Sequence, residues 1–92
     1  MDRRTFLVSK ATNLRTLLTP YIKTPEHTAL LSQYSEKDIE TLTATYLLPL
    51  YATGTLSVAT SHLANELCIT DTALIEKVGR YFQCFCETLQ AS

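Results

Sequence analysis

Three cysteines and two histidines are the residues of this sequence that could form a metal site. Cys84 and Cys86 are two residues apart, and His62 and Cys68 precede them. Four such ligands could hold zinc, which requires its thiolates to converge on one ion at about 2.3 Å. On an intact helix, however, residues two apart point about 200° away from each other. A shared ion or a disulfide would need the last helix to break, so we predict no metal site.

Each of these side chains has a simpler interpretation in a helical domain. Cys86 falls on an apolar helix face and is predicted to be a small core residue. Cys84 points elsewhere and is predicted to be an exposed thiol. His27 is expected to face solvent, and His62 is expected to be partly buried with one hydrogen bond.

The acidic residues form no catalytic pattern. Glu36, Asp38 and Glu40 cluster at a predicted helix start, where the positive end of the helix dipole favours carboxylates. No serine or cysteine accompanies a histidine and an acid at the spacing of a known catalytic motif, and two glycines are too few for a phosphate-binding loop. We therefore predict that the protein is not an enzyme and uses no cofactor.

The segment 57–81 resembles a helix-turn-helix. Leu63 and Ala64 stand where that motif has an apolar and then a small residue. Cys68 stands at the turn, where the motif prefers glycine because a left-handed backbone is easiest there. The resemblance implies a DNA-binding regulator that acts as a dimer, and Cys68 is a departure from the motif.

The second helix of that motif would present four residues to DNA, namely Thr70, Thr72, Lys77 and Arg80. Asp71 and Glu76 lie among them, and DNA phosphates repel acidic side chains. Most affinity for DNA comes from lysine and arginine contacts to phosphates. Nucleic-acid binding is therefore the disfavoured alternative.

Helices are the elements that must position these residues. In the last segment, apolar residues recur every three or four positions, at Leu74, Ile75, Val78, Tyr81, Phe82, Phe85, Cys86 and Leu89. They line one broad helix face, which must be buried against something. No segment alternates with period two over a sustained length. We predict a single all-α domain over residues 1–92, a small irregular or orthogonal bundle of four to five helices.

Helix start and stop signals divide the chain. The predicted helices cover residues up to about 19, and 24–34, 35–48, 57–67 and 71–89. Thr24 before Pro25 is typical of a helix start, residues 35–38 resemble a capping box, and Thr70 or Asp71 is expected to cap the last helix. Pro49 lacks a donor N–H and is expected to kink the third helix or to end it near Leu48.

The charges are unevenly distributed although the net charge is −1. Residues 1–23 hold five bases against one acid, a net of +4, and residues 24–92 hold three bases against eight acids, a net of −5. The basic first helix could pack on the acidic remainder, reach a neighbouring subunit, or bind nucleic acid or an anionic membrane. The first two explanations are favoured, because four net charges are few for binding nucleic acid.

A low content of charged residues, 18%, and a wide apolar helix face together predict a binding protein. We expect a non-catalytic protein–protein interaction module, either a small adaptor, a chaperone or an assembly subunit, that holds a partner through an apolar helical face or forms a homodimer. Its predicted contact residues are aromatic, since aromatic side chains carry much interface energy: Tyr34, Tyr46, Tyr51, Phe82 and Phe85.

The expected location is the reducing cytoplasm. The cysteine count is odd, and the apolar run near the start comprises only Phe6, Leu7 and Val8, which is too short for a signal peptide. No stretch approaches the roughly 20 apolar residues of a membrane span.

Overall fold

Every regular element of residues 2–91, the part that the computed structural model describes, is helical. The elements are α1 (Arg3–Leu18), the 3₁₀ turn η1 (Thr19–Tyr21), α2 (Pro25–Ser32), α3 (Ile39–Leu42), the π-helical segment η2 (Thr43–Leu47), α4 (Leu48–Ala52), α5 (Ser57–Glu66) and α6 (Thr72–Gln90). Because α3, η2 and α4 follow one another without a break, the described helices form five rods. The predicted all-α bundle is confirmed.

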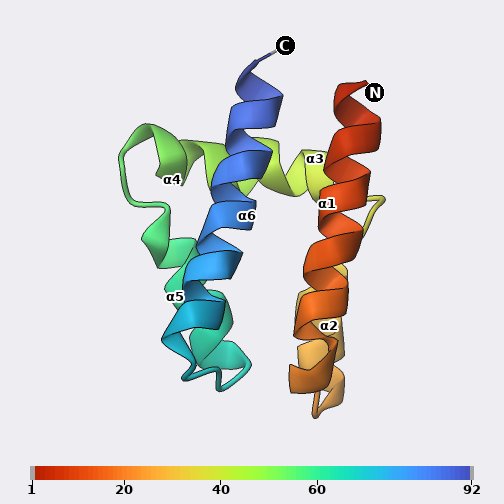
Figure 1. The fold of residues 1–92 in the computed structure, drawn as a ribbon, viewed down its shortest axis with the longest axis vertical. Coiled ribbons are helices and arrows are strands. Elements are labelled where there is room, and N and C mark those ends of the chain that lie inside the picture. The colour runs from red at the N-terminus through yellow and green to blue at the C-terminus, as the bar shows by residue number, and fades with distance from the viewer. Residues whose placement is uncertain (1, 92) are drawn as a thin grey trace.

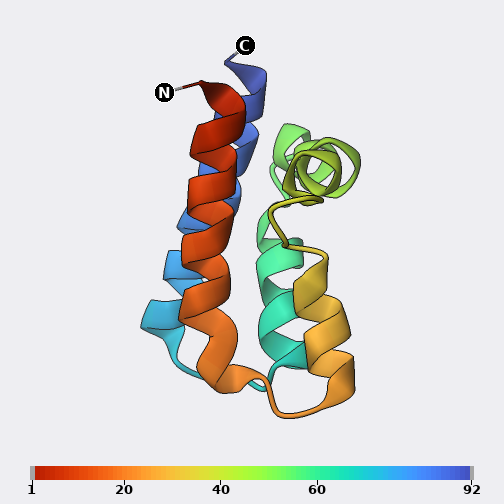
Figure 2. The same ribbon diagram turned by 90° about the vertical axis from the view of Figure 1, so that its right-hand side faces the viewer.

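The rods lie in two layers (Figures 1 and 2). The first and last helices, α1 and α6, pack side by side and run in opposite directions. The second layer contains α2, the rod α3–α4 and α5 (Figure 2). The two layers enclose one apolar core, to which α1 contributes Leu7, Ala11, Leu14 and Leu18, and α6 contributes Leu74, Val78, Phe82, Phe85 and Cys86.

Side-chain caps begin two of the predicted helices, α2 and α6. The Thr24 hydroxyl accepts a hydrogen bond from the N–H of His27 at 3.1 Å, with Pro25 in the first turn of α2. The Asp71 carboxylate accepts from the N–H groups of Ala73 and Leu74 at 3.0 and 3.4 Å. These caps satisfy N–H groups that have no partner within the helix, so the predicted starts of α2 and α6 are confirmed.

The predicted start of the third helix at Ser35 is wrong. Residues 35–38 form a turn, in which the N–H of Asp38 donates to the carbonyl of Ser35 at 3.1 Å, and the helix begins only at Ile39. The Ser35 hydroxyl donates to the Asp38 carboxylate at 3.1 Å instead of accepting from a backbone N–H. The preceding residue, Tyr34, lies in the core, so tertiary packing places the turn here rather than the local capping pattern.

Pro49 does not end the rod, which continues to Ala52. The turn before it is π-helical, and the N–H of Leu48 donates to the carbonyl of Thr43, five residues earlier. Proline cannot donate to the carbonyl four residues before it, and its ring crowds that carbonyl. The wider π turn accommodates the missing hydrogen bond and the proline ring within the rod.

The ends of α4 and α5 share one hydrogen-bonding pattern, the Schellman motif. At the end of α5, the N–H of Ile69 donates to the carbonyl of Ala64 at 2.8 Å and the N–H of Cys68 to that of Asn65 at 3.2 Å. The corresponding bonds at the end of α4 involve Thr55 and Gly54. The left-handed residue of the motif is Gly54 in one case, with φ 73°, and Cys68 in the other, with φ 57°.

Replacing Cys68 with glycine is therefore expected to raise the free energy of unfolding by about 1 kcal/mol, because a side chain in the left-handed region clashes with the backbone. The Cys68 side chain is exposed, so its removal loses no core contact. The matched control is Gly54→Ala, which should lower stability although nothing lies within 4 Å of the added Cβ. Urea unfolding followed by circular dichroism measures both. A less stable Cys68→Gly variant would contradict this account of the turn.

Candidate interaction surface

Three of the five predicted contact aromatics lie in the core. Phe82 and Phe85 are 0% exposed, Tyr34 is 2% exposed, and the ring of Tyr34 stacks on that of Phe82 with centroids 5.5 Å apart. Burial raises the pKa of the Tyr34 hydroxyl, and nearby Tyr46 raises it further. Because these three rings are enclosed, a partner could reach them only by opening the domain.

The remaining two predicted contact residues, Tyr46 and Tyr51, are half-buried and pack against the core. Among the large apolar side chains that the structure describes, Val58 stands out as exposed, at 54%. Apart from Val58, the large apolar side chains of the helices are therefore enclosed wholly or partly within the domain itself. Between them, α1, α5 and the rod α3–α4 cover the wide stripe of α6.

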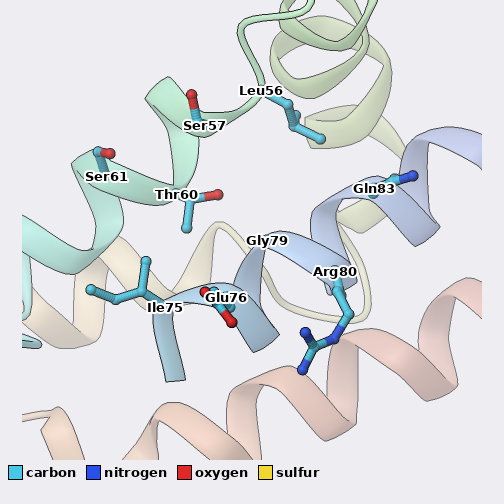
Figure 3. A pocket seen from close by; sticks show the side chains of 9 residues that line it. All are labelled: Leu56, Ser57, Thr60, Ser61, Ile75, Glu76, Gly79, Arg80 and Gln83. Carbon is cyan, nitrogen blue, oxygen red and sulfur yellow. The ribbon is translucent and has the colours of Figure 1, made fainter. Parts of the chain in front are cut away.

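An open groove lies between α5 and α6, and its volume is about 460 Å³ (Figure 3). The residues that line it come from the start of α5 and from the middle of α6: Leu56, Ser57, Thr60, Ser61, Ile75, Glu76, Gly79, Arg80 and Gln83. We call this feature the α5–α6 groove. Its walls are mostly small or apolar, with one acid and one base.

Gly79 is the unusual residue of the α5–α6 groove. It lies in the interior of α6, where glycine is less stable than alanine by about 0.5–1 kcal/mol. Its backbone does not adopt the left-handed conformation that favours glycine, and a Cβ added there would meet Thr60 Oγ1 at 3.7 Å, an ordinary contact. Neither the helix nor its packing against α5 requires a glycine at this position.

The rim of the groove carries both apolar surface and charge. Val58 follows Ser57 and precedes Ser61 by one helical turn, so its exposed side chain flanks the α5 wall. Glu76 and Arg80 stand on the α6 wall. The guanidinium of Arg80 extends away from α5 toward α1 (Figure 3).

The turn between α5 and α6 has the backbone that the helix-turn-helix resemblance implies. Cys68 is left-handed in the place where the motif prefers glycine. The motif's apolar positions are buried, namely Leu63, Ala64, Leu67, Ile69, Leu74 and Val78. All four predicted DNA-facing residues are exposed: Thr70, Thr72, Lys77 and Arg80. The Asp71 carboxylate among them is bonded to the N–H groups at the start of α6, where the helix dipole offsets its charge.

The basic first helix partly packs on the acidic remainder of the chain. Arg3 forms an ion pair with Glu40 at 3.5 Å, and the Thr12 hydroxyl donates to Glu36 at 2.7 Å. Both partners of the ion pair are about two-fifths exposed, so its contribution to stability is small. Lys10, by contrast, lies beside α6 next to two other bases.

The histidines and cysteines correct several sequence expectations. His62 is exposed on α5, whereas it was expected to be partly buried. His27 is half-buried, and its Nδ1 accepts from the N–H of Lys23 at 3.1 Å. Cys84 is half-buried rather than exposed. Cys86 is a core residue as predicted, and burial raises the pKa of its thiol to about 11.

Within residues 2–91, no group of three or more histidine, cysteine, aspartate or glutamate side chains is arranged to hold a metal ion. None of the helices in this part of the chain combines the length and the apolar character needed to cross a membrane. No model of a protein family, no curated protein and no solved structure matches the chain.

Proposed function

We propose that this protein is a non-catalytic protein–protein interaction module whose α5–α6 groove holds an amphipathic helix of a partner. The observation that carries the proposal is a wide groove lined by Gly79, a glycine that neither the helix nor its packing requires. A destabilising residue without a structural reason is expected at a functional site. The adaptor, chaperone and assembly roles all use such a surface.

The dimensions of the groove suit a short helical segment. The lining residues of α6 run from Ile75 to Gln83, eight steps of 1.5 Å or about 12 Å along the helix axis. That length matches about two turns of a partner helix. Small residues let two helices approach closely, and Leu56, Ile75 and Val58 offer apolar contacts. An interface of this size is at the small end of specific interfaces, so we expect weak, transient binding.

Substitutions at Gly79 separate stability from binding. Gly79→Ala is expected to raise the free energy of unfolding by about 0.5–1 kcal/mol, because alanine is the better helix residue and its Cβ fits beside Thr60. Gly79→Leu should fill the groove with the domain still folded. The probe is a panel of amphipathic helical peptides of three to four turns. The peptides differ in the charge of the residues that would face Glu76 and Arg80. NMR of the labelled protein should show that the peptides perturb the amides of residues 56–61 and 75–83. The peptide dissociation constant should be at least about tenfold higher for Gly79→Leu than for the parent.

Perturbations elsewhere, or equal binding to the parent and Gly79→Leu, would contradict the proposal. A second copy of the chain is another occupant to test, by sedimentation over a range of concentrations. Self-association that Gly79→Leu abolishes would make the groove a homodimer interface rather than a site for a different partner.

A DNA-binding regulator is the second candidate function, and the left-handed Cys68 turn between α5 and α6 is the observation that favours it. Such a protein should shift a duplex probe, and its affinity should fall steeply with salt. Lys77→Gln and Arg80→Gln should weaken that shift. The absence of any shift at low salt would exclude this function and leave the groove proposal intact.

A further inference from the structure

A second pocket, of about 230 Å³, lies at the seam between α1 and α6. Lys10 reaches it from α1, and Lys77, Arg80, Tyr81 and Cys84 reach it from α6. We call it the basic pocket. Three of these five side chains are cationic, and none is acidic.

Within residues 2–91, no carboxylate forms an ion pair with the three cations of the basic pocket. The ion pair within 4.0 Å in the described part of the chain joins Arg3 and Glu40, at a different place on α1. Glu76 is one turn from Arg80, but the Arg80 guanidinium points toward α1 instead (Figure 3). Cations gathered without a counter-charge repel one another, and an anion bound among them would relieve that repulsion.

Two side chains of the basic pocket are held in place by neighbouring aromatic rings. The ammonium group of Lys10 lies 5.4 Å from the centroid of the Phe6 ring, within the range of a cation–π interaction. The Tyr81 ring packs against the buried Phe85, with centroids 6.4 Å apart. Part of the pocket is therefore ordered before any ligand binds, which lowers the entropy cost of binding.

We infer that the basic pocket binds a phosphate monoester or inorganic phosphate. Arginine offers a planar fork of N–H donors that matches phosphate oxygens, and each lysine adds a compact charge. A phosphate monoester brings up to two negative charges and three acceptor oxygens, more than a carboxylate does. The pocket is smaller than the roughly 300–1,000 Å³ of a site for a drug-sized molecule, so it holds a phosphoryl group and little more.

A small phosphate fits these observations better than an extended polyanion does. Glu76 is exposed on α6 and Asp71 is exposed at its N-cap, and both carboxylates would weaken binding to a nucleic-acid backbone running along the helix. A single phosphoryl group at the seam avoids both acids. The basic pocket shares Arg80 with the α5–α6 groove, but its other four residues are different and the inference does not rest on the proposed function.

Cys84 provides a reporter inside the basic pocket, and exposed Cys68 provides an internal reference. The rates of alkylation by anionic iodoacetate and neutral iodoacetamide would be measured for each thiol by mass spectrometry. Three nearby cations should raise the iodoacetate-to-iodoacetamide ratio at Cys84 about fivefold over that at Cys68. Lys10→Gln and Lys77→Gln should each lower this ratio, whereas Lys23→Gln, which removes the same charge elsewhere, should not.

Inorganic phosphate and glycerol phosphate in the millimolar range should slow the alkylation of Cys84 about threefold, which is the slowing expected when the ligand concentration is about twice its dissociation constant. The alkylation rate of Cys68 should not change. NMR titration with the same two probes should perturb the amides of residues 10, 77, 80, 81 and 84. Sodium chloride at matched ionic strength should produce neither effect. Equal alkylation ratios at the two thiols, equal protection by sodium chloride, or protection only by duplex DNA, whose phosphates are diesters, would each overturn the inference.

Discussion

Replacing Phe82 with alanine is expected to lower the free energy of unfolding by about 3–5 kcal/mol. The Phe82 ring is 0% exposed and contacts two other enclosed rings, Tyr34 with centroids 5.5 Å apart and Phe85 with centroids 6.4 Å apart. Its removal leaves a cavity where the two layers meet. A domain of 92 residues has a total stability of roughly 5–14 kcal/mol, so the variant should lose between about a fifth and all of it.

Urea and thermal unfolding followed by circular dichroism would measure this loss. The matched controls are substitutions of the two neighbouring residues. Tyr81→Ala removes a half-buried ring, and Gln83→Ala removes an exposed side chain. The loss should decrease from Phe82 to Tyr81 and should nearly vanish at Gln83. A Phe82→Ala variant that melts within a degree or two of the parent would mean that the stripe of α6 is a free binding face, which a partner buries instead.

Replacing Leu14 with alanine is expected to cost about 2–5 kcal/mol. Leu14 is fully buried in the middle of the α1 stripe. Its removal tests whether α1 is part of the core, as the structure places it, or a basic arm that reaches a neighbouring molecule.

Leu17→Ala is the matched control for α1, because the same side chain is removed from the same helix at a half-buried position. It should cost clearly less than Leu14→Ala, since fewer contacts are lost. Equal and small losses at both positions would contradict the docking of α1 on α6. The loss at Leu14 should also be insensitive to salt, because apolar packing is not screened.

Local signals predicted the helices well wherever a cap and an apolar stripe agreed. Thr24 before Pro25, Asp71, and the stripe from Leu74 to Leu89 each locate an element from contacts within one or two turns. The same signals failed at Ser35, since the turn of residues 35–38 follows from the packing of Tyr34 against Phe82, 48 positions further along the chain. They left open whether Pro49 kinks or ends the rod, and the structure shows that the rod passes through Pro49 by way of a π turn.

The candidate sites were harder to predict, because they depend on which helix faces meet. A wide apolar stripe shows that Phe82 and Phe85 must be covered, but not whether α1 or a second molecule covers them. The α5–α6 groove had a visible signal that was missed: a glycine inside a helix, and serines one turn apart at Ser57 and Ser61. The basic pocket had no such signal, since Lys10 and Lys77 come together only when the first and last helices pair.

That pairing also sets the order in which the domain can form during synthesis. The helix α6 contacts α1, η2, α4 and α5, so the core lacks its central wall until residues 72–90 have been made. At about 5–20 residues per second, translating those 19 residues takes about 1–4 seconds. Throughout synthesis of the preceding part, the apolar stripe of α1 has no α6 to cover it. The core can therefore close only after residues 72–90 have been synthesised and α6 has docked on the elements that precede it.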